Sequence, residues 1–307
     1  MSVDTLQMRI RKRKNPTAVR LDLRADLLPP GLLADAVAAH GETAGALAEA
    51  CGSFGIGILD ALADVVPAVI FNTAYYDAMG AAGAALLQRL CAHAEKRNYY
   101  VILETMRSDL EAAAELCAQT YFGALQIGET QTALYGADAL CIGAFTGSDG
   151  VRPYLPYCRD REKSLFLLAR TANKSAREVQ DLISGDRVIH TVMTDLAVRW
   201  GADLLGKCGY SQVGVVVSAA GAGLLQELRR RYDRLFFLVS GYGVPGSMAK
   251  DVQYAFDQLG HGAVVAASDG IAGAWRKAGS GGLDFAEQAR TAAERMRDEI
   301  ARYVTVR

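Results

Sequence analysis

The chain has 307 residues, 51% of them hydrophobic, and its 33 Lys and Arg nearly balance its 34 Asp and Glu. This balance excludes the basic excess that would indicate nucleic-acid binding, and no acidic tail is present. Six scattered cysteines without a Cys-x-x-Cys pair, together with four histidines, predict no metal site. No signal peptide and no apolar segment of membrane-spanning length is evident, so we expect a cytoplasmic protein without membrane contact.

The first predicted element is a solvated amphipathic lead-in helix over about residues 1–14, which ends in the basic run Arg-Ile-Arg-Lys-Arg-Lys. After it, β-branched segments alternate with alanine-rich ones. The predicted strands are Thr17–Asp22, Ala68–Thr73, Tyr99–Glu104, Ala139–Ile142, Ser164–Thr171, Val213–Ser218, Phe236–Ser240 and Ala263–Ser268. The predicted helices are Gly31–Ala50, Ala78–Arg97, Asp109–Phe122, Val188–Leu205, Leu224–Arg231, Lys250–Leu259 and Phe285–Tyr303. Eight such units predict a closed (β/α)8 TIM barrel, as a single domain over residues 1–307.

The chemistry of such a barrel lies where its strands end and its loops begin. The residues expected at the strand ends are Asp22, Asn72, Glu104, Cys141, Thr171, Ser218, Ser240 and Ser268. This set contains two carboxylates and no lysine, arginine or histidine. We therefore expect a mouth without a cation at its strand ends.

Two glycine-rich segments follow the last two predicted strands: residues 240–246, Ser-Gly-Tyr-Gly-Val-Pro-Gly, and residues 268–271, Ser-Asp-Gly-Ile. Glycines let backbone N–H groups approach an anion, although turns require glycine for other reasons as well. Because both segments stand where barrels commonly hold phosphate, they indicate a phosphate-binding ancestry.

The third predicted strand continues into residues 104–110, Glu-Thr-Met-Arg-Ser-Asp-Leu. Alternation along the strand predicts that Glu104 and Met106 face the barrel mouth. Asp109 has two open interpretations, as the N-cap of the following helix or as a side chain of the site.

Several blocks in register resemble the orotidine 5′-monophosphate decarboxylase family, in particular its longer bacterial branch, over nearly the whole chain. Residues 104–110 are similar to the family's Asp-x-Lys-x-x-Asp-Ile. Other similar blocks are Arg-Leu-Asp at 20–22 (Gly-Leu-Asp in the family), Asn-Thr-Ala-Tyr-Tyr-Asp at 72–77 (within Lys-Pro-Gln-x-Ala-Phe-Phe-Glu), Thr-Ala-Asn at 171–173 (Thr-Ser-Asn) and the two glycine-rich loops.

The resemblance implies a cofactor-free decarboxylase that forms a homodimer with its site at the interface. It implies substrate-binding positions at Asp22, Asn72, Thr171, Ala172 and Asn173. Ile70 and Met106 stand where the family has its two lysines, and Glu104 and Asp109 are the catalytic remnants. Because a thioether carries no positive charge and donates no proton, we expect decarboxylation to be absent or very weak.

The phosphate loops depart from the family's pattern in the same way. Their remaining positions are Gly243, Pro245, Gly246, Asp269 and Gly270. Pro245 replaces a glutamine and has no N–H to donate, and Asp269 replaces an arginine. An alternative for Asp269 is that it only caps the following turn and points away from the site.

Three hypotheses remain open from the sequence. The leading one is a non-catalytic family member that serves as a binding or assembly partner, either as a homodimer through the barrel mouth or in a heteromer with an active paralogue. The second is an enzyme with altered chemistry, whose acidic mouth takes a cation, a divalent metal or an unphosphorylated nucleoside. The third is a working decarboxylase with a displaced lysine, for which Lys174 is the least implausible candidate.

Overall fold

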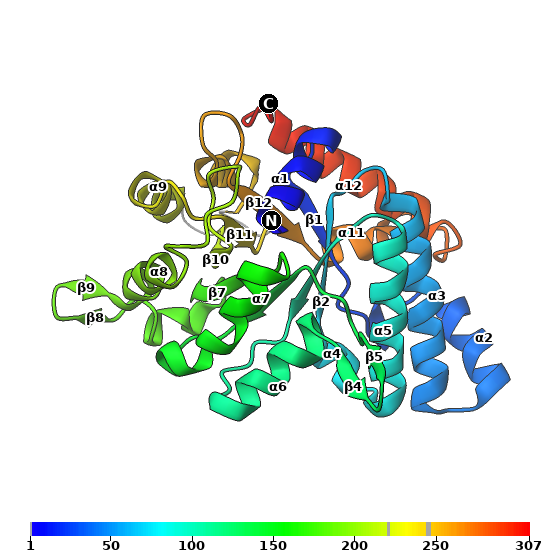
Figure 1. Ribbon diagram of the computed structural model, residues 1–307. Helices are drawn as coiled ribbons and strands as arrows, with labels where there is room; N and C mark the ends of the chain where they lie inside the picture. The colour runs from blue at the N-terminus through cyan, green and yellow to red at the C-terminus, as the bar shows by residue number, and fades with distance from the viewer. Residues whose placement is uncertain (1, 220–221, 244–246) are drawn as a thin grey trace.

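A computed structural model describes residues 2–219, 222–243 and 247–307 of the chain. Eight parallel strands form a closed barrel in the order β1-β12-β11-β10-β7-β6-β3-β2. Pairing of β12 with β1, at Thr17 and Val265, closes the ring, which confirms the predicted TIM barrel (Figure 1). The strands are β1 (Thr17–Arg20), β2 (Ala68–Asn72), β3 (Tyr100–Glu104), β6 (Ala139–Ile142), β7 (Ser164–Arg170), β10 (Val213–Ser218), β11 (Phe237–Ser240) and β12 (Ala263–Ala267).

The helices surround this barrel, and two small hairpins that were not predicted extend from its loops. The α-helices are α1 (Ser2–Arg13), α2 (Pro30–His40), α3 (Ala44–Leu62), α4 (Thr73–Asp77), α5 (Gly80–Lys96), α6 (Glu111–Phe122), α7 (Leu155–Asp160), α8 (Ile189–Trp200), α9 (Ala222–Arg231), α10 (Ala249–Val252), α11 (Asp269–Ala272) and α12 (Phe285–Ala301). The 3-10 turns are η1 (Ala25–Leu27), η2 (Gly147–Gly150), η3 (Arg152–Tyr154), η4 (Lys174–Glu178), η5 (Gln253–Ala255) and η6 (Ala274–Lys277). The hairpins pair β4 (Leu125–Ile127) with β5 (Thr130–Thr132), and β8 (Ile183–Ser184) with β9 (Arg187–Val188).

Three predicted helices are wrong in their extent. The predicted helix Val188–Leu205 ends early, since α8 stops at Trp200 and Gly201 is its C-cap. The predicted helix Gly31–Ala50 is broken, because Gly41 adopts φ 71° after α2 and Thr43 starts α3 by accepting a hydrogen bond from the Ala46 N–H. The predicted helix Lys250–Leu259 shortens to α10 and η5. Its second half turns back, because Asp257 Oδ1 accepts hydrogen bonds from the N–H groups of Leu259 and His261.

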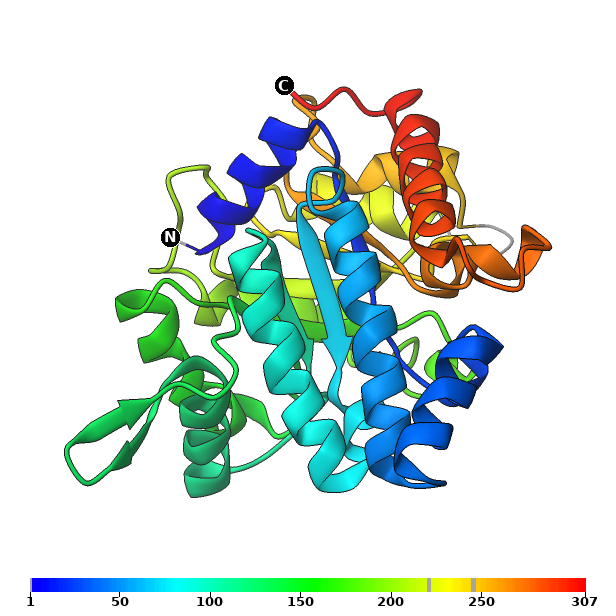
Figure 2. The same ribbon diagram turned by 90° about the vertical axis from the view of Figure 1, so that its right-hand side faces the viewer.

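Helix α1 closes the amino-terminal end of the barrel, so the prediction of a solvated amphipathic lead-in helix is correct for its exposed face and wrong for its apolar face. Val3, Leu6 and Ile10 are fully buried in one cluster with the side chains that fill the barrel interior. The Ser2 hydroxyl lies 2.6 Å from the Tyr100 hydroxyl at the start of β3. Figures 1 and 2 show α1 at the end of the molecule opposite the β4–β5 hairpin. The carboxyl ends of the strands therefore form the open mouth.

Helix α3 corrects the expectation that no segment reaches membrane-spanning length. It is the one described helix that is long and apolar enough to cross a bilayer, judged by its 19 residues and composition. In this fold it packs against α2, α5 and α12, with 56% of its apolar window buried. Its apolar character is therefore explained by the outer core of the barrel.

Candidate functional site

Arginine 20 ends β1 and lies at the centre of the polar mouth, so the expectation of a mouth without a cation at its strand ends is wrong. Its Nη1 donates to Glu104 Oε1 at 2.6 Å, and its Nε donates to Asp22 Oδ2 at 3.3 Å. The side chains of Arg20, Asp22 and Glu104 are 18%, 8% and 1% exposed. Ile70, at a lysine position of the family, pairs directly with Arg20 across β1 and β2. One guanidinium thus holds both buried carboxylates.

The sequence contained a signal for Arg20. It occupies the glycine position of the Gly-Leu-Asp block, and it shares a strand face with Asp22 because the two are two residues apart. An arginine side chain therefore fills barrel space where the family's motif has no side chain.

Burial raises the pKa of Glu104; the positive charge of Arg20 opposes that rise, and the negative charge of Asp22 adds to it. For Arg20, burial acts to lower the pKa, but the two carboxylates outweigh it and the pKa is raised. Glu104 Oε2 and Asp22 Oδ1 are buried, and neither has a hydrogen-bond partner among the described residues. One positive and two negative groups leave the cluster with an excess of negative charge and of hydrogen-bond acceptors.

The loop after β3 carries Met106, at an expected lysine position, and Asp109, the other expected catalytic remnant. Met106 is 39% exposed and adopts φ 51°, and its N–H donates to the Cys141 carbonyl at 3.1 Å. Asp109 is not the N-cap of α6, since Leu110 takes that position. Instead, Asp109 Oδ1 accepts a hydrogen bond from Arg107 Nη2 at 3.1 Å. The capping interpretation is therefore wrong, and Asp109 is tied to its own loop.

The expected substrate-binding residues on β2 and after β7 satisfy local hydrogen bonds. Asn72 Oδ1 caps α4 by accepting from the Ala74 N–H at 3.1 Å. Thr171 Oγ1 lies 2.6 Å from Asn173 Oδ1. Ala172 lies so close to Gly241 that a Cβ on that glycine would approach the Ala172 Cβ to 2.9 Å. The loops after β7 and β11 are therefore in contact at the mouth.

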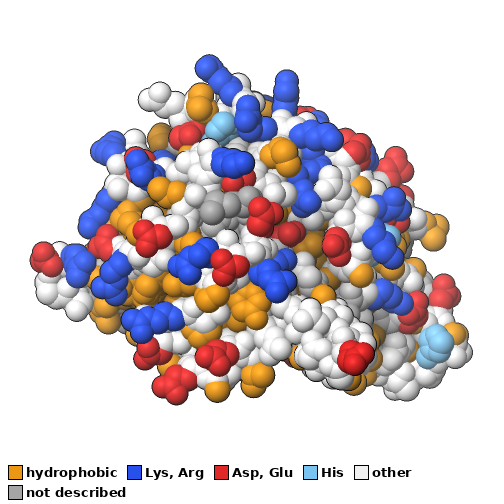
Figure 3. Space-filling model, in the orientation of Figure 1, with side chains coloured by type: hydrophobic (Ala, Val, Ile, Leu, Met, Phe, Trp, Pro, Cys, Tyr) orange, Lys and Arg blue, Asp and Glu red, His pale blue; other side chains and the backbone are white. Residues whose placement is uncertain are grey.

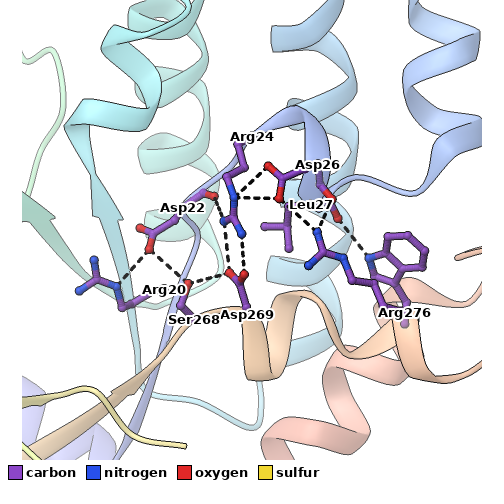
Figure 4. Close-up of polar contacts among 9 residues, drawn as sticks. Arg20, Asp22, Arg24, Asp26, Leu27, Ser268, Asp269 and Arg276 are labelled. Carbon is purple, nitrogen blue, oxygen red and sulfur yellow. Dashed lines mark hydrogen bonds and ion pairs between the residues drawn. The ribbon is translucent and has the colours of Figure 1, made fainter. Parts of the chain in front are cut away.

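The described part of the phosphate loops holds Asp269 in a second ion pair. Arg24 Nη1 and Nη2 donate to Asp269 Oδ1 and Oδ2 at 3.2 and 2.5 Å (Figure 4). Ser268 is the N-cap of α11, and the Asp269 carboxylate is bound to Arg24, so the interpretation of Asp269 as a turn cap that points away is wrong. Gly270 follows in α11, and Gly243 adopts φ 95° and donates its N–H to the Ser247 carbonyl. Pro245 and Gly246 lie outside the described residues.

The two ion-pair groups form one continuous network, seen in Figure 4. Ser268 Oγ lies 3.2 Å from Asp22 Oδ2 and 3.2 Å from Asp269 Oδ1, so it links the Arg20 group to the Arg24 group. Arg24 Nη1 also donates to the Asp22 carbonyl at 3.1 Å. The described residues contain no group of three or more His, Cys, Asp or Glu side chains arranged to hold a metal ion. The network can therefore bind hydrogen-bond donors or a cationic group, but its guanidinium groups do not release protons near neutral pH.

Comparison with known proteins identifies the family. No family model matches the chain. An orotidine 5′-phosphate decarboxylase of Clostridium acetobutylicum is 33% identical over 253 residues, which cover 82% of this chain and 85% of that protein. The enzyme of the same name from Petrotoga mobilis is 30% identical over 302 residues, 98% of each chain.

Solved structures agree on the fold. The OMP decarboxylase of Leishmania donovani superposes with a TM-score of 0.75 at 23% identity, over 98% of both chains. The orotidine 5′-monophosphate decarboxylase of Plasmodium berghei superposes with a TM-score of 0.76 at 14% identity, over 98% of this chain and 97% of that one. At these identities the structures show the barrel alone, whereas the curated relatives confirm the resemblance seen in the motifs. This chain belongs to the orotidine 5′-phosphate decarboxylase family.

Proposed function

We propose that this protein is a family member that does not decarboxylate orotidine 5′-monophosphate and that its barrel serves as a binding or assembly partner. The observation that carries the proposal is Arg20, the cation paired with Asp22 and Glu104 in the described mouth. Decarboxylation in this family needs an ammonium group that stabilises a carbanion and then protonates it. A guanidinium group supplies charge but keeps its protons at neutral pH.

The two positions that resemble the family's lysines support the same conclusion. Ile70 is fully buried beside Arg20, and Met106 stands partly exposed on the loop after β3. Neither side chain can carry a positive charge. Loss of one preorganised donor to a developing anion typically costs about 3–4 kcal/mol of transition-state stabilisation, and loss of the proton donor adds to that cost.

A second candidate function, an active decarboxylase, is favoured by the names of the curated relatives. It requires a lysine near the two buried carboxylates. Lys174 begins η4 and is exposed, and no ion pair joins a lysine to Asp22 or Glu104 in the described part of the chain. We therefore rank this candidate below the non-catalytic one.

A sensitive assay of orotidine 5′-monophosphate consumption tests the choice. The wild type would be compared with the Clostridium acetobutylicum relative as positive control and with a Met106→Lys, Asp269→Arg double mutant. We expect no turnover by the wild type above the protein-free blank. Ready turnover would overturn the proposal, and its loss in Lys174→Ala would identify the displaced lysine.

We also propose that the protein forms a homodimer through the mouth. Three large apolar side chains are exposed on the loops after β3 and β6: Met106 (39%), Leu110 (52%) and Phe145 (68%). These loops touch, since the Gly143 N–H donates to the Arg107 carbonyl at 2.8 Å. Exposed apolar groups that gather in this way are typical of an interface.

Light scattering after gel filtration tests the dimer, with Phe145→Glu expected to yield monomer. Met8→Glu is the matched control, because Met8 is 61% exposed on α1 at the opposite end of the barrel. A monomeric wild type, or equal effects of both substitutions, would contradict the interface. Affinity capture from the native cell tests the heteromer with an active paralogue, which is excluded if the chain returns only itself.

The remaining chemistry supports a cytoplasmic protein that does not bind nucleic acid. All six cysteines are free thiols, five of them buried, as expected in a reducing compartment. On the face shown in Figure 3, Lys and Arg side chains are interspersed with Asp and Glu. That face lacks the continuous basic patch that attracts phosphate backbones.

A further inference from the structure

The Arg24–Asp269 pair has the geometry of a bound anion. Two guanidinium nitrogens of Arg24 meet two carboxylate oxygens at 3.2 and 2.5 Å, the parallel arrangement that arginine also makes with phosphate oxygens. Arg24 is held in place from behind, since its Nε lies 3.0 Å from Asp26 Oδ1 and its guanidinium lies 6.0 Å from the Tyr75 ring centre. The guanidinium is therefore preorganised toward Asp269.

The surroundings of Asp269 leave room for a larger anion. Asp269, Gly243 and Gly270 line one pocket of about 380 Å³, which lies between the loop after β11, α11 and α12. A Cβ built on Gly243 or Gly270 would meet no atom of the described residues within 4 Å. Lys277, an exposed cation, lines the same pocket. The Asp269 carboxylate lines this pocket and contacts the Arg24 guanidinium, which does not itself line the pocket.

The four ion-paired groups around Arg24 balance one another in charge. Arg24 and Arg276 are balanced by Asp26 and Asp269, with Arg276 Nη2 lying 3.5 Å from Asp26 Oδ2. The hydrogen bonds from Arg24 lower the pKa of Asp269, so that it is ionised at neutral pH. An incoming phosphate would have to displace that carboxylate and face its negative charge.

We infer that the Asp269 carboxylate occupies an anion site at Arg24 in place of a ligand's phosphate, and that it restricts the barrel mouth to unphosphorylated ligands. The inference rests on the proposed function in taking the barrel as a binding protein that does not decarboxylate. Its test measures binding without any decarboxylation, so that the two can fail independently. Asp269 is then the residue that determines whether a phosphomonoester is accepted.

Isothermal titration calorimetry with inorganic phosphate, ribose 5-phosphate and ribose tests the inference on wild type, Asp269→Asn, Asp26→Asn and an Arg24→Met, Asp269→Asn double mutant. Asp269→Asn and Asp26→Asn remove the same charge from the same arginine. Asp26, however, is 68% exposed and does not line the pocket. Asp269→Gly is the second variant if the amide misfolds.

We expect Asp269→Asn to bind phosphate and ribose 5-phosphate at least about tenfold more tightly than wild type, which corresponds to about 1.4 kcal/mol. Ribose binding should not change, Asp26→Asn should resemble wild type, and the double mutant should lose the gain. A wild type that prefers ribose 5-phosphate to ribose overturns the inference. The inference is also overturned if neither Asp269→Asn nor Asp269→Gly binds phosphate more tightly than wild type. The same holds if Asp26→Asn gains as much affinity as Asp269→Asn, or if the double mutant without Arg24 keeps the gain.

Discussion

Replacing Arg20 by methionine tests the electrostatics of the mouth most directly. We expect Arg20→Met to lower the free energy of unfolding by about 3–5 kcal/mol at pH 7.5, because it leaves two buried carboxylates without a cation. Protonation of Glu104, which is 1% exposed, limits this cost. At pH 7.5, protonating a carboxyl whose ordinary pKa is about 4.3 costs about 4 kcal/mol, at 1.36 kcal/mol per pH unit. This cost lies within the expected loss of about 3–5 kcal/mol.

The loss should depend on pH in a definite direction. The pKa of Glu104 is already raised in the folded protein by burial, so the folded state holds this proton more tightly than the unfolded chain. Such a group contributes stability that is present below the unfolded pKa and is lost as pH rises through the folded pKa. Arg20→Met raises the folded pKa further. Urea unfolding should therefore show a small difference between variant and wild type near pH 4.5 and a larger one at pH 8.

Two further variants control the measurement. Arg170→Met is matched, because Arg170 also ends a barrel strand and is also 18% exposed, but its partner Asp181 is 38% exposed. It should cost less than about 1 kcal/mol. Combined with Arg20→Met, Glu104→Gln should recover about 2 kcal/mol of the lost free energy of unfolding, because it removes one of the two carboxylates left without a cation. The effects of two contacting charges are not additive. If Arg20→Met costs no more than Arg170→Met and its cost is independent of pH, the buried-pair argument is refuted.

Three other stability predictions can be checked by the same urea titration. Burial lowers the pKa of Arg229 to about 10, so it stays charged at neutral pH. Arg229→Met should lower the free energy of unfolding by about 2–4 kcal/mol, because it leaves four backbone carbonyls without their donor. These carbonyls belong to Tyr232, Leu235, Ala255 and Gly262. Leu6→Ala should cost about 3 kcal/mol, because Leu6 is fully buried where α1 closes the barrel, whereas a freely solvated helix would predict almost none. Gly41→Ala should cost about 1 kcal/mol, because φ at residue 41 is 71°.

The sequence predicted the barrel because the signal for each strand is local. A segment such as Val213–Ser218 is apolar and β-branched throughout, and in the structure it is buried along its whole length. The break between α2 and α3 was missed because Gly41 and Thr43 lie inside an otherwise helical composition. The burial of α1 was missed because it depends on where the barrel interior ends, which is a tertiary property.

The site was predicted in part for the same reason. Alternation along a strand is periodic, so Glu104 could be assigned to the mouth, and the same rule applied to β1 would have assigned Arg20 there with Asp22. Arg24 and Asp269 are different, since 245 residues separate them. Barrel closure brings their loops together by pairing β1 with β12, but the direction of a loop side chain follows no periodic rule.

The mouth shows how stability and catalysis place different demands on a buried cation. Two carboxylates at the ends of β1 and β3 require a nearby positive charge to remain buried, and any cation that reaches them meets that demand. Protonation of a carbanion requires in addition that the cation release a proton, which lysine can do and arginine cannot. Under the proposed function, a single Arg20 in place of the lysines therefore preserves the folded barrel without supplying the proton that the chemical step requires. The resemblance along the chain and the departure at the mouth are thus compatible, because the fold responds to charge and the reaction responds to acidity.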